Sequence, residues 1–203
     1  MVFNYPTPIF RIFLDTEVFV SANFNYQDSS FTKLVDLVNN DELVLYITTV
    51  TRNEILSNIE KEVHNSDSSL KTIHKEFRKN AKILYNYQNF KSLFSLNHNK
   101  DETCQELKNQ FLNYLEKIKA QVISVDQVSP EDIFDQYFNN LPPFKEGKKK
   151  YEFPDAFSIA ALEKEAMNND FKIYVISRDN DWQKACKKNN NLICLKNIAE
   201  FLE

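Results

Sequence analysis

The sequence predicts an α/β fold with three α/β/α layers around a mostly parallel central sheet. Short apolar runs of strand length alternate with segments in which apolar residues recur at helical spacing, as in βαβ units with right-handed crossovers. The 203 residues, of which 42% are hydrophobic and 27% charged, are also enough to bury one sizeable core. We therefore expect residues 1–203 to form a single domain.

The first quarter of the chain predicts a strand, a helix, a second strand and a second helix. Residues 8–14 form an almost continuous apolar run that ends at Asp15, as expected of a strand buried on both faces. Residues 31–38 repeat apolar side chains at helical spacing, and residues 43–47 are a second strand-like run. The segment Thr-Arg-Asn-Glu at 51–54 has the form of a capping box, which predicts that a helix begins near Thr51.

A polar helical segment is expected from about residue 65 to 120. Its apolar residues keep helical spacing but are separated by many polar side chains. We interpret residues 65–120 as a helical insertion in the domain. Two roles stay open for it: a hairpin of solvated helices packed against the domain, or a lid or wall over a substrate groove.

The last part of the chain returns to alternating strands and helices. A Ser-Pro pair at 129–130 predicts a helix start, because proline suits the first helical position. The stretch 141–150, rich in proline and lysine, is expected to be a loop. The other predicted elements are strands at 121–125, 171–177 and 192–195, and helices from Pro154, after Asp179 and at the carboxyl terminus.

The composition excludes several classes of chemistry. A single glycine, Gly147, rules out a glycine-rich phosphate loop of the P-loop, dinucleotide-binding or kinase type. The three histidines lack H-E-x-x-H spacing and the three cysteines lack a C-x-x-C pair, which argues against a zinc site. A net charge of -4 argues against coating of nucleic acid by bulk positive charge. Carboxylates remain as the abundant chemical groups.

The expected cellular setting is a reducing cytoplasm. Three cysteines leave one unpaired in any disulfide scheme. No window approaches the roughly 20 apolar residues of a membrane span, and the amino-terminal stretch lacks the features of a secretory signal. We therefore expect no membrane partner.

Four acidic residues that are far apart in the sequence are expected to meet at one edge of the sheet. They end a strand, open a helix after a strand, or follow a strand: Asp15, Glu54, Asp155 and Asp179. The carboxyl ends of parallel strands all lie along one edge, which brings such positions together. Each acid also has a purely structural interpretation, as a turn residue, a capping partner, a helix-dipole contact or an N-cap.

Clustered carboxylates favour a hard divalent cation, because like charges crowded at one edge repel each other unless a cation neutralises them. Mg²⁺ and Mn²⁺ prefer such oxygen ligands. One or two bound cations can lower the pKa of a water and neutralise charge on the attacking and leaving oxygens of a phosphodiester. This hydrolysis needs no histidine base, cysteine nucleophile or glycine loop. The sequence therefore predicts phosphodiester hydrolysis with Mg²⁺ or Mn²⁺ as the cofactor.

Basic residues flank the predicted acidic edge. Because the substrate is anionic and the site acidic, neighbouring cations are expected to hold the flanking phosphates. The candidates for contact with nucleic acid are Arg52, Lys148, Lys149, Lys150 and Arg178. A run of lysines is also typical of a solvated loop.

Four segments around the acids resemble the acidic motifs of PIN-domain nucleases. They are Phe-Leu-Asp-Thr-Glu-Val-Phe at 13–19, Thr-Thr-Val-Thr-Arg-Asn-Glu at 48–54, Glu-Phe-Pro-Asp-Ala at 152–156 and Val-Ile-Ser-Arg-Asp-Asn-Asp-Trp at 175–182. The motifs follow the family's order and cover nearly the whole chain. The chain is also similar to a larger PIN-like branch with a helical insertion before the third motif. No single motif is specific, so the ordered set carries the resemblance.

The resemblance implies which residues form the site. The implied catalytic and metal-binding acids are Asp15, Glu54, Asp155 and Asp179. Asp181 is a fifth metal ligand or a helix cap, and Glu152 approaches the metal or faces solvent. One position departs from the family: Glu17 stands where asparagine or serine is common, and its extra charge puts the detailed metal geometry in question.

The resemblance implies an endoribonuclease, like the toxins of toxin–antitoxin pairs or RNA-processing enzymes. RNA is the expected partner, while a DNA substrate, a homodimer and an antitoxin partner stay open. Two other functions stay open. One is a haloacid-dehalogenase-type phosphatase, although Glu17 and Phe19 stand where its nucleophile motif has aspartate and threonine. The other is a catalytically inactive PIN fold that binds RNA or protein.

Overall fold

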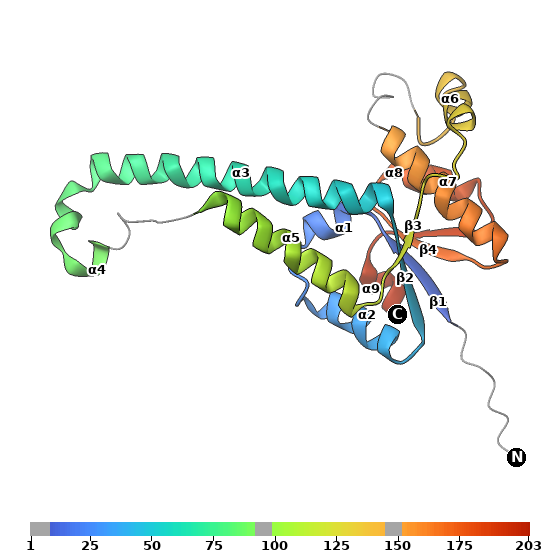
Figure 1. Cartoon of the computed structure of the whole chain (residues 1–203), viewed down its shortest axis with the longest axis horizontal. Coiled ribbons are helices and arrows are strands. Elements are labelled where there is room, and N and C mark those ends of the chain that lie inside the picture. Colours follow the sequence, from blue (N-terminus) through green and yellow to red (C-terminus); the bar gives the residue numbers. More distant parts are fainter. Residues whose placement is uncertain (1–8, 92–98, 145–151) are drawn as a thin grey trace, which may run out of the picture. The chain divides into compact units, whose positions relative to one another are not determined.

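The computed structural model describes residues 9–91, 99–144 and 152–203 (Figure 1). The chain divides into two compact units, one formed by Met1–Ile55 with Asn113–Glu203 and the other by Leu56–Leu112. The first unit contains the sheet and every described candidate residue, and the second is helical where it is described. A single domain with an insertion at about 65–120 stays a prediction.

The first unit is built on a five-stranded sheet with the order β3-β2-β1-β4-β5. The described strands all pair in parallel, which confirms the predicted α/β class. Their apolar runs suit a sheet that is covered on both faces. The strands are β1 (Phe10–Leu14), β2 (Leu43–Thr48), β3 (Gln121–Ile123), β4 (Ile173–Ile176) and β5 (Leu192–Leu195).

Helices lie on both faces of this sheet, as the three-layer prediction requires (Figure 1). On one face, α7 and α8 pack on a core that includes Phe13, Val175 and Trp182. The neighbours of Phe13 in β1 point to the opposite face, because side chains alternate along a strand. The sequence does not predict α1, since six residues are too few to show a helical period. The helices are α1 (Thr16–Ser21), α2 (Ser29–Asn39), α6 (Pro130–Phe138), α7 (Phe153–Asn168), α8 (Asn180–Lys187) and α9 (Ile198–Leu202).

The amino end of α3 (Thr49–Asn80) corrects the predicted capping box. The backbone N–H of Thr51 donates to Thr48 Oγ1 at 3.0 Å, so Thr48 caps the helix and Thr51 lies within its first turn. The Thr48 hydroxyl also lies 2.9 Å from the Ser158 hydroxyl of α7. A helix start near Thr51 is confirmed to within two residues, but the interpretation of residues 51–54 as a capping box is wrong.

The second unit consists of helical segments in its described part. The helix α3 continues through 32 residues, because no proline or glycine interrupts it. Within the unit, Lys108 donates to Glu60 at 2.6 Å, and this hydrogen bond lowers the pKa of Glu60. No helix in the described ranges is long and apolar enough to cross a membrane. The remaining helical elements are η1 (Lys82–Asn86), α4 (Gln88–Lys91) and α5 (Lys100–Lys117), whose last residues belong to the first unit.

We expect Thr48→Val to lower the free energy of unfolding by about 2 kcal/mol, because it removes a helix cap and a buried hydrogen-bond partner. Glu54→Gln should not destabilise the fold, since burial raises the pKa of Glu54 and disfavours its charged form. Denaturant unfolding at neutral pH measures both variants. If both substitutions lowered the free energy of unfolding equally, this result would support the interpretation of residues 51–54 as a capping box.

Candidate functional site

The strand order places a topological switch point between β1 and β4. The chain winds outward in one direction from β1 to β3 and in the other from β4 to β5, so the topology switches at the β1–β4 pair. Ligands of open parallel sheets bind at such a switch point, outside the carboxyl ends of the strands. Asp15 directly follows β1, and its backbone N–H donates to the carbonyl of Ile176, the last residue of β4, at 3.1 Å. The first candidate acid is therefore fixed at this point.

Asp15 is buried at the switch point and held by a neutral donor. Only 8% of Asp15 is exposed, and its Oδ2 accepts a hydrogen bond of 2.7 Å from the Ser177 hydroxyl. Burial raises the pKa of Asp15 to about 6, and the Ser177 bond opposes only part of this effect. The charges of Glu54 and Glu17 raise it further. The charged form of Asp15 is thus poorly compensated.

Glu54 reaches the same place from α3. Its Oε2 accepts a hydrogen bond of 3.0 Å from the hydroxyl of Thr16, the residue after Asp15. Burial raises the pKa of Glu54, while the Thr16 bond lowers it. Because Thr16 opens α1, this contact ties the second candidate acid to the end of β1.

Asp155 lies in the first turn of α7 and has the largest shift of these acids. Its Oδ1 accepts a hydrogen bond of 3.0 Å from Trp182 Nε1. The indole is fixed in turn, since Trp182 is buried and stacks on Phe13 with ring centroids 5.2 Å apart. Burial and then the charge of Asp15 raise the pKa of Asp155 to about 8. Glu54 and Glu152 raise it as well, so several carboxylates act on this one group.

Glu152 completes the group of interacting acids. It is 9% exposed, so it does not face solvent, and its charge acts on Asp155. The electrostatic effects connect Asp15, Glu54, Asp155 and Glu152, which come from three separate parts of the chain. We call these four residues the acidic cluster.

Asp179 and Asp181 have structural partners beside this cluster. Asp179 is exposed and caps α8, where its Oδ1 accepts a 2.6 Å hydrogen bond from the backbone N–H of Asp181. Asp181 is 2% exposed and forms an ion pair of 3.4 Å with Lys184. Asp179 remains linked to the cluster through its backbone N–H, which donates to the Ser177 hydroxyl at 3.1 Å.

The side chains do not form a finished metal site in their present positions. Within the described ranges, no set of three or more histidine, cysteine, aspartate or glutamate side chains is arranged to hold a metal ion. The acidic cluster is therefore defined by mutual electrostatic effects and shared helix and strand ends.

The basic candidates differ in their surroundings. Arg52 is half-buried, and its Nε finds no hydrogen-bond partner among the described residues. The Arg178 guanidinium is exposed and lies 3.8 Å from the Glu17 carboxylate. A depression of about 320 Å³ includes Arg178, Glu17 and Lys196 in its lining. The lysines predicted at 148–150 lie outside the described residues.

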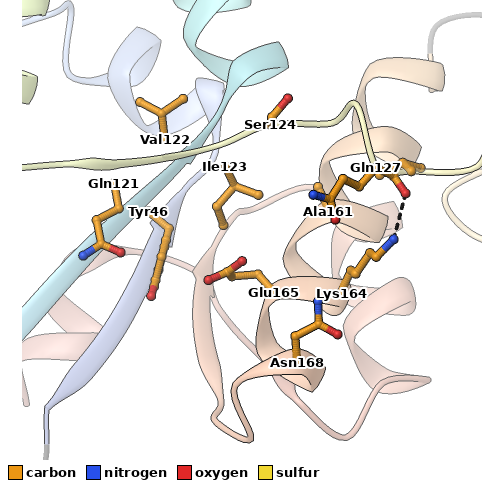
Figure 2. Close-up of a pocket in the computed structure, with 11 residues that line it drawn as sticks. Tyr46, Gln121, Val122, Ile123, Ser124, Gln127, Ala161, Lys164, Glu165 and Asn168 are labelled. Carbon is orange, nitrogen blue, oxygen red and sulfur yellow. Dashed lines mark hydrogen bonds between the residues drawn. The ribbon is translucent and has the colours of Figure 1, made fainter.

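A separate pocket lies between the edge strand β3 and α7 (Figure 2). It holds about 200 Å³, and none of the described candidate residues lines it. Figure 2 shows the Glu165 carboxylate pointing toward Tyr46, with Lys164 donating to the Gln127 carbonyl at 2.9 Å. This pocket does not belong to the acidic cluster.

The sequence analysis did not identify the neutral hydrogen-bond donors of the site. Ser177, Thr16 and Trp182 each donate to one of the candidate acids. All three fall inside the quoted acidic motifs, which is the signal that could have identified them. Their donor roles depend on contacts that spacing alone does not reveal.

The parallel sheet and the acids at its switch point define an α/β protein with an acidic site. A model of the PIN domain matches residues 12–182, and the chain belongs to this family. The predicted resemblance is confirmed. The family generally comprises nucleases.

Comparison with individual proteins adds one similar structure. The chain is similar to the crystal structure of VapBC2 from Rickettsia felis bound to a DNA fragment from their promoter. The identity is 13%, with 91% of this chain and 97% of that chain covered and a TM-score of 0.41. No curated protein matches the chain.

The raised pKa values make a prediction about stability in the absence of metal. The folded state binds more protons than the unfolded state between about pH 4 and 8, so stability falls as pH rises through the folded pKa values of Asp15 and Asp155. Asp155→Asn should flatten this fall and raise the melting temperature at pH 8.5 by on the order of 5 °C. Thermal unfolding in EDTA at pH 5 and 8.5 measures the effect.

A matched control is Asp36→Asn, which changes an exposed aspartate of α2 and should leave the pH dependence as it is. If Asp155→Asn and Asp36→Asn show the same profile as the native chain, the burial of charge at Asp155 is refuted.

Proposed function

We propose that this chain is a metal-dependent endoribonuclease that hydrolyses RNA phosphodiester bonds at the acidic cluster. The observation that carries the proposal is the convergence of Asp15, Glu54 and Asp155 at the switch point of a PIN-domain sheet, with burial raising the pKa of each. Glycine loops and histidine ligands are excluded by the composition. The chemistry is therefore assigned to carboxylates.

The donor set fits Mg²⁺ or Mn²⁺. Its members are hard oxygen donors, and the raised pKa values of Asp15 and Asp155 indicate negative charge that the neighbouring neutral donors do not offset. The proposed ligands are Asp15, Glu54, Asp155, Asp179 and Asp181. When bound, the cation supplies an activated water and neutralises charge on the phosphodiester oxygens.

The residues of the chain orient these ligands. Ser177 holds Asp15 Oδ2, Thr16 holds Glu54 Oε2, and Trp182 holds Asp155 Oδ1. Each bond fixes one carboxylate oxygen and restricts the rotation of its side chain. Neutral donors orient a carboxylate without removing the charge that a cation needs.

The basic residues would hold the substrate backbone. Arg178 and Lys196 line one depression and offer cations beside Asp179. Arg52 lies on α3 two residues before Glu54, and its Nε has no hydrogen-bond partner among the described residues, so it retains a donor for a phosphate. These positions support contact with a nucleic-acid backbone, as proposed for Arg52, Arg178 and the lysines at 148–150.

Cleavage of RNA tests the proposal directly. Native chain and Asp155→Asn are incubated with single-stranded RNA and DNA in Mn²⁺, Mg²⁺ or EDTA, with Asp36→Asn as the matched control. We expect RNA cleavage by the native chain and Asp36→Asn in the presence of cation, at least about 100-fold slower cleavage by Asp155→Asn, and none in EDTA. Equal cleavage by all three proteins would reveal a contaminant. Cleavage confined to DNA would refute the RNA assignment but keep the nuclease.

Metal linkage gives an independent test. A cation at one hundred times its Kd stabilises the folded state by about 2.7 kcal/mol. We expect Mn²⁺ or Mg²⁺ to raise the melting temperature of the native chain and Asp15→Asn to remove most of this rise, as measured by thermal unfolding. A melting temperature indifferent to both cations, together with no cleavage, would favour the inactive binding module. Release of phosphate from small monoesters without RNA cleavage would favour the phosphatase.

A further inference from the structure

Aromatic side chains gather between the carboxyl half of α6 and the first turn of α7. Phe134 and Phe138 stand one helical turn apart, with stacked rings whose centroids are 6.4 Å apart. They are 49% and 71% exposed, which is unusual for phenylalanine. We call Phe134, Tyr137, Phe138 and Phe153 the aromatic ridge. A pair of exposed, stacked aromatic rings above two half-buried ones is a candidate interaction site.

The inner part of the ridge is fixed by packing. Tyr137 lies against Phe153 with ring centroids 5.2 Å apart, and Phe153 contacts Phe144 at 4.9 Å. Phe144 is 2% exposed and belongs to a buried cluster with Ile133 of α6. The outer rings therefore stand on a packed base and need little ordering when a ligand binds.

The ridge adjoins the acidic cluster along the chain. The rings of Phe134 and Phe153 lie 5.5 Å apart, which joins α6 to the first residue of α7. Asp155 follows two residues later in the same turn of α7, and Glu152 directly precedes Phe153. A polymer whose scissile phosphate lies at the cluster thus has the ridge beside its adjoining residues.

We propose that the aromatic ridge stacks unpaired bases of the nucleic-acid strand that the acidic cluster cleaves. The inference rests on the proposed nuclease function and narrows its substrate to strands that are single-stranded beside the cut. Every base has an apolar face that stacks on an aromatic ring, whatever its sequence. Bases inside a duplex already stack on their neighbours and are not available to the ridge.

The charges around the ridge favour contact with bases over contact with phosphates. The helix α6 carries Glu131, Asp132 and Asp135 and has no lysine or arginine. A surface of this charge repels a phosphate backbone, whereas a base face is neutral. The backbone contacts are therefore assigned to basic residues outside the ridge, such as Arg178. Stacking should consequently depend little on salt, in contrast to phosphate contacts.

Binding of a fluorescently labelled single-stranded RNA of mixed sequence tests the proposal. The full chain carries Asp155→Asn to prevent cleavage, and fluorescence anisotropy gives the Kd. We expect Phe138→Ala to weaken binding about tenfold, at low and at high salt. Phe138→Trp should retain or strengthen binding, while Phe138→Leu, which keeps apolar volume without an aromatic face, should not restore it. Because the Phe138 side chain is exposed, its substitution should leave the fold intact, and melting temperatures verify this.

Met167→Ala is the matched control. Met167 is 69% exposed and lies near the far end of the same helix α7, about 20 Å from its first turn at the helical rise per residue. This variant should bind RNA like the parent chain. A second readout is 2-aminopurine placed in the RNA, whose fluorescence should be quenched on binding to the parent and not to Phe138→Ala.

Several results would refute base stacking on the aromatic ridge. An unchanged Kd for Phe138→Ala refutes it, and equal rescue by leucine and tryptophan points instead to an apolar protein partner. Equal sensitivity of single-stranded and duplex RNA to Phe138→Ala also refutes base stacking. If the chain shows cation-dependent cleavage and Phe138→Ala changes neither KM nor Kd, base stacking on the ridge is refuted and the nuclease function stands. RNA binding that requires Phe138 in a chain without cleavage activity overturns the nuclease alone, and a chain that neither binds nor cleaves RNA or DNA overturns both.

Discussion

Three carboxylates are withdrawn from water beside one another, and the rest of the site depends on how their negative charge is compensated. Asp15, Glu54 and Asp155 are brought to one point because β1 lies next to β4 and because α3 and α7 begin at the same edge. Burial raises the pKa values of all three, the charges of neighbouring carboxylates raise those of Asp15 and Asp155 further, and the neutral donors around them offset only part of the effect. Such a group is stable when it holds protons or a cation, and the two compete for the same oxygens.

The neutral hydrogen-bond donors orient the carboxylates without neutralising their charge. A lysine or arginine in place of Ser177 or Trp182 would satisfy the charge of Asp15 or Asp155 and remove the need for a cation. A hydroxyl and an indole N–H instead fix the carboxylate direction and leave its charge in place. Asp179 differs from these acids, because it is exposed and its side chain caps α8. Asp15, Glu54 and Asp155 therefore form a group withdrawn from solvent, whereas Asp179 lies exposed at its rim.

Local patterns predicted the strands and the acids but not their partners. Apolar runs identify β1 and β2, and the parallel edge rule explains why Asp15 and Glu54 come together. The Ser177–Asp15 bond joins residues 162 positions apart, and no local spacing encodes such a contact. The capping box failed for a different reason. Thr48 and Thr51 have the same capping chemistry, and only the end of β2 decides which of them starts the helix.

Acidity at the site and a net charge of -4 raise the question of how an anionic strand would be held there. Phosphate contacts alone would have to overcome repulsion from the acidic cluster and from α6. Stacking on Phe134 and Phe138 gives affinity through the neutral parts of the strand, so it adds no positive charge near the carboxylates. A lysine placed at the ridge would strengthen binding but would also compete with a cation for Asp155. In the proposed function, the separation of base contacts from charged contacts would keep the carboxylates free for a metal while still positioning the strand.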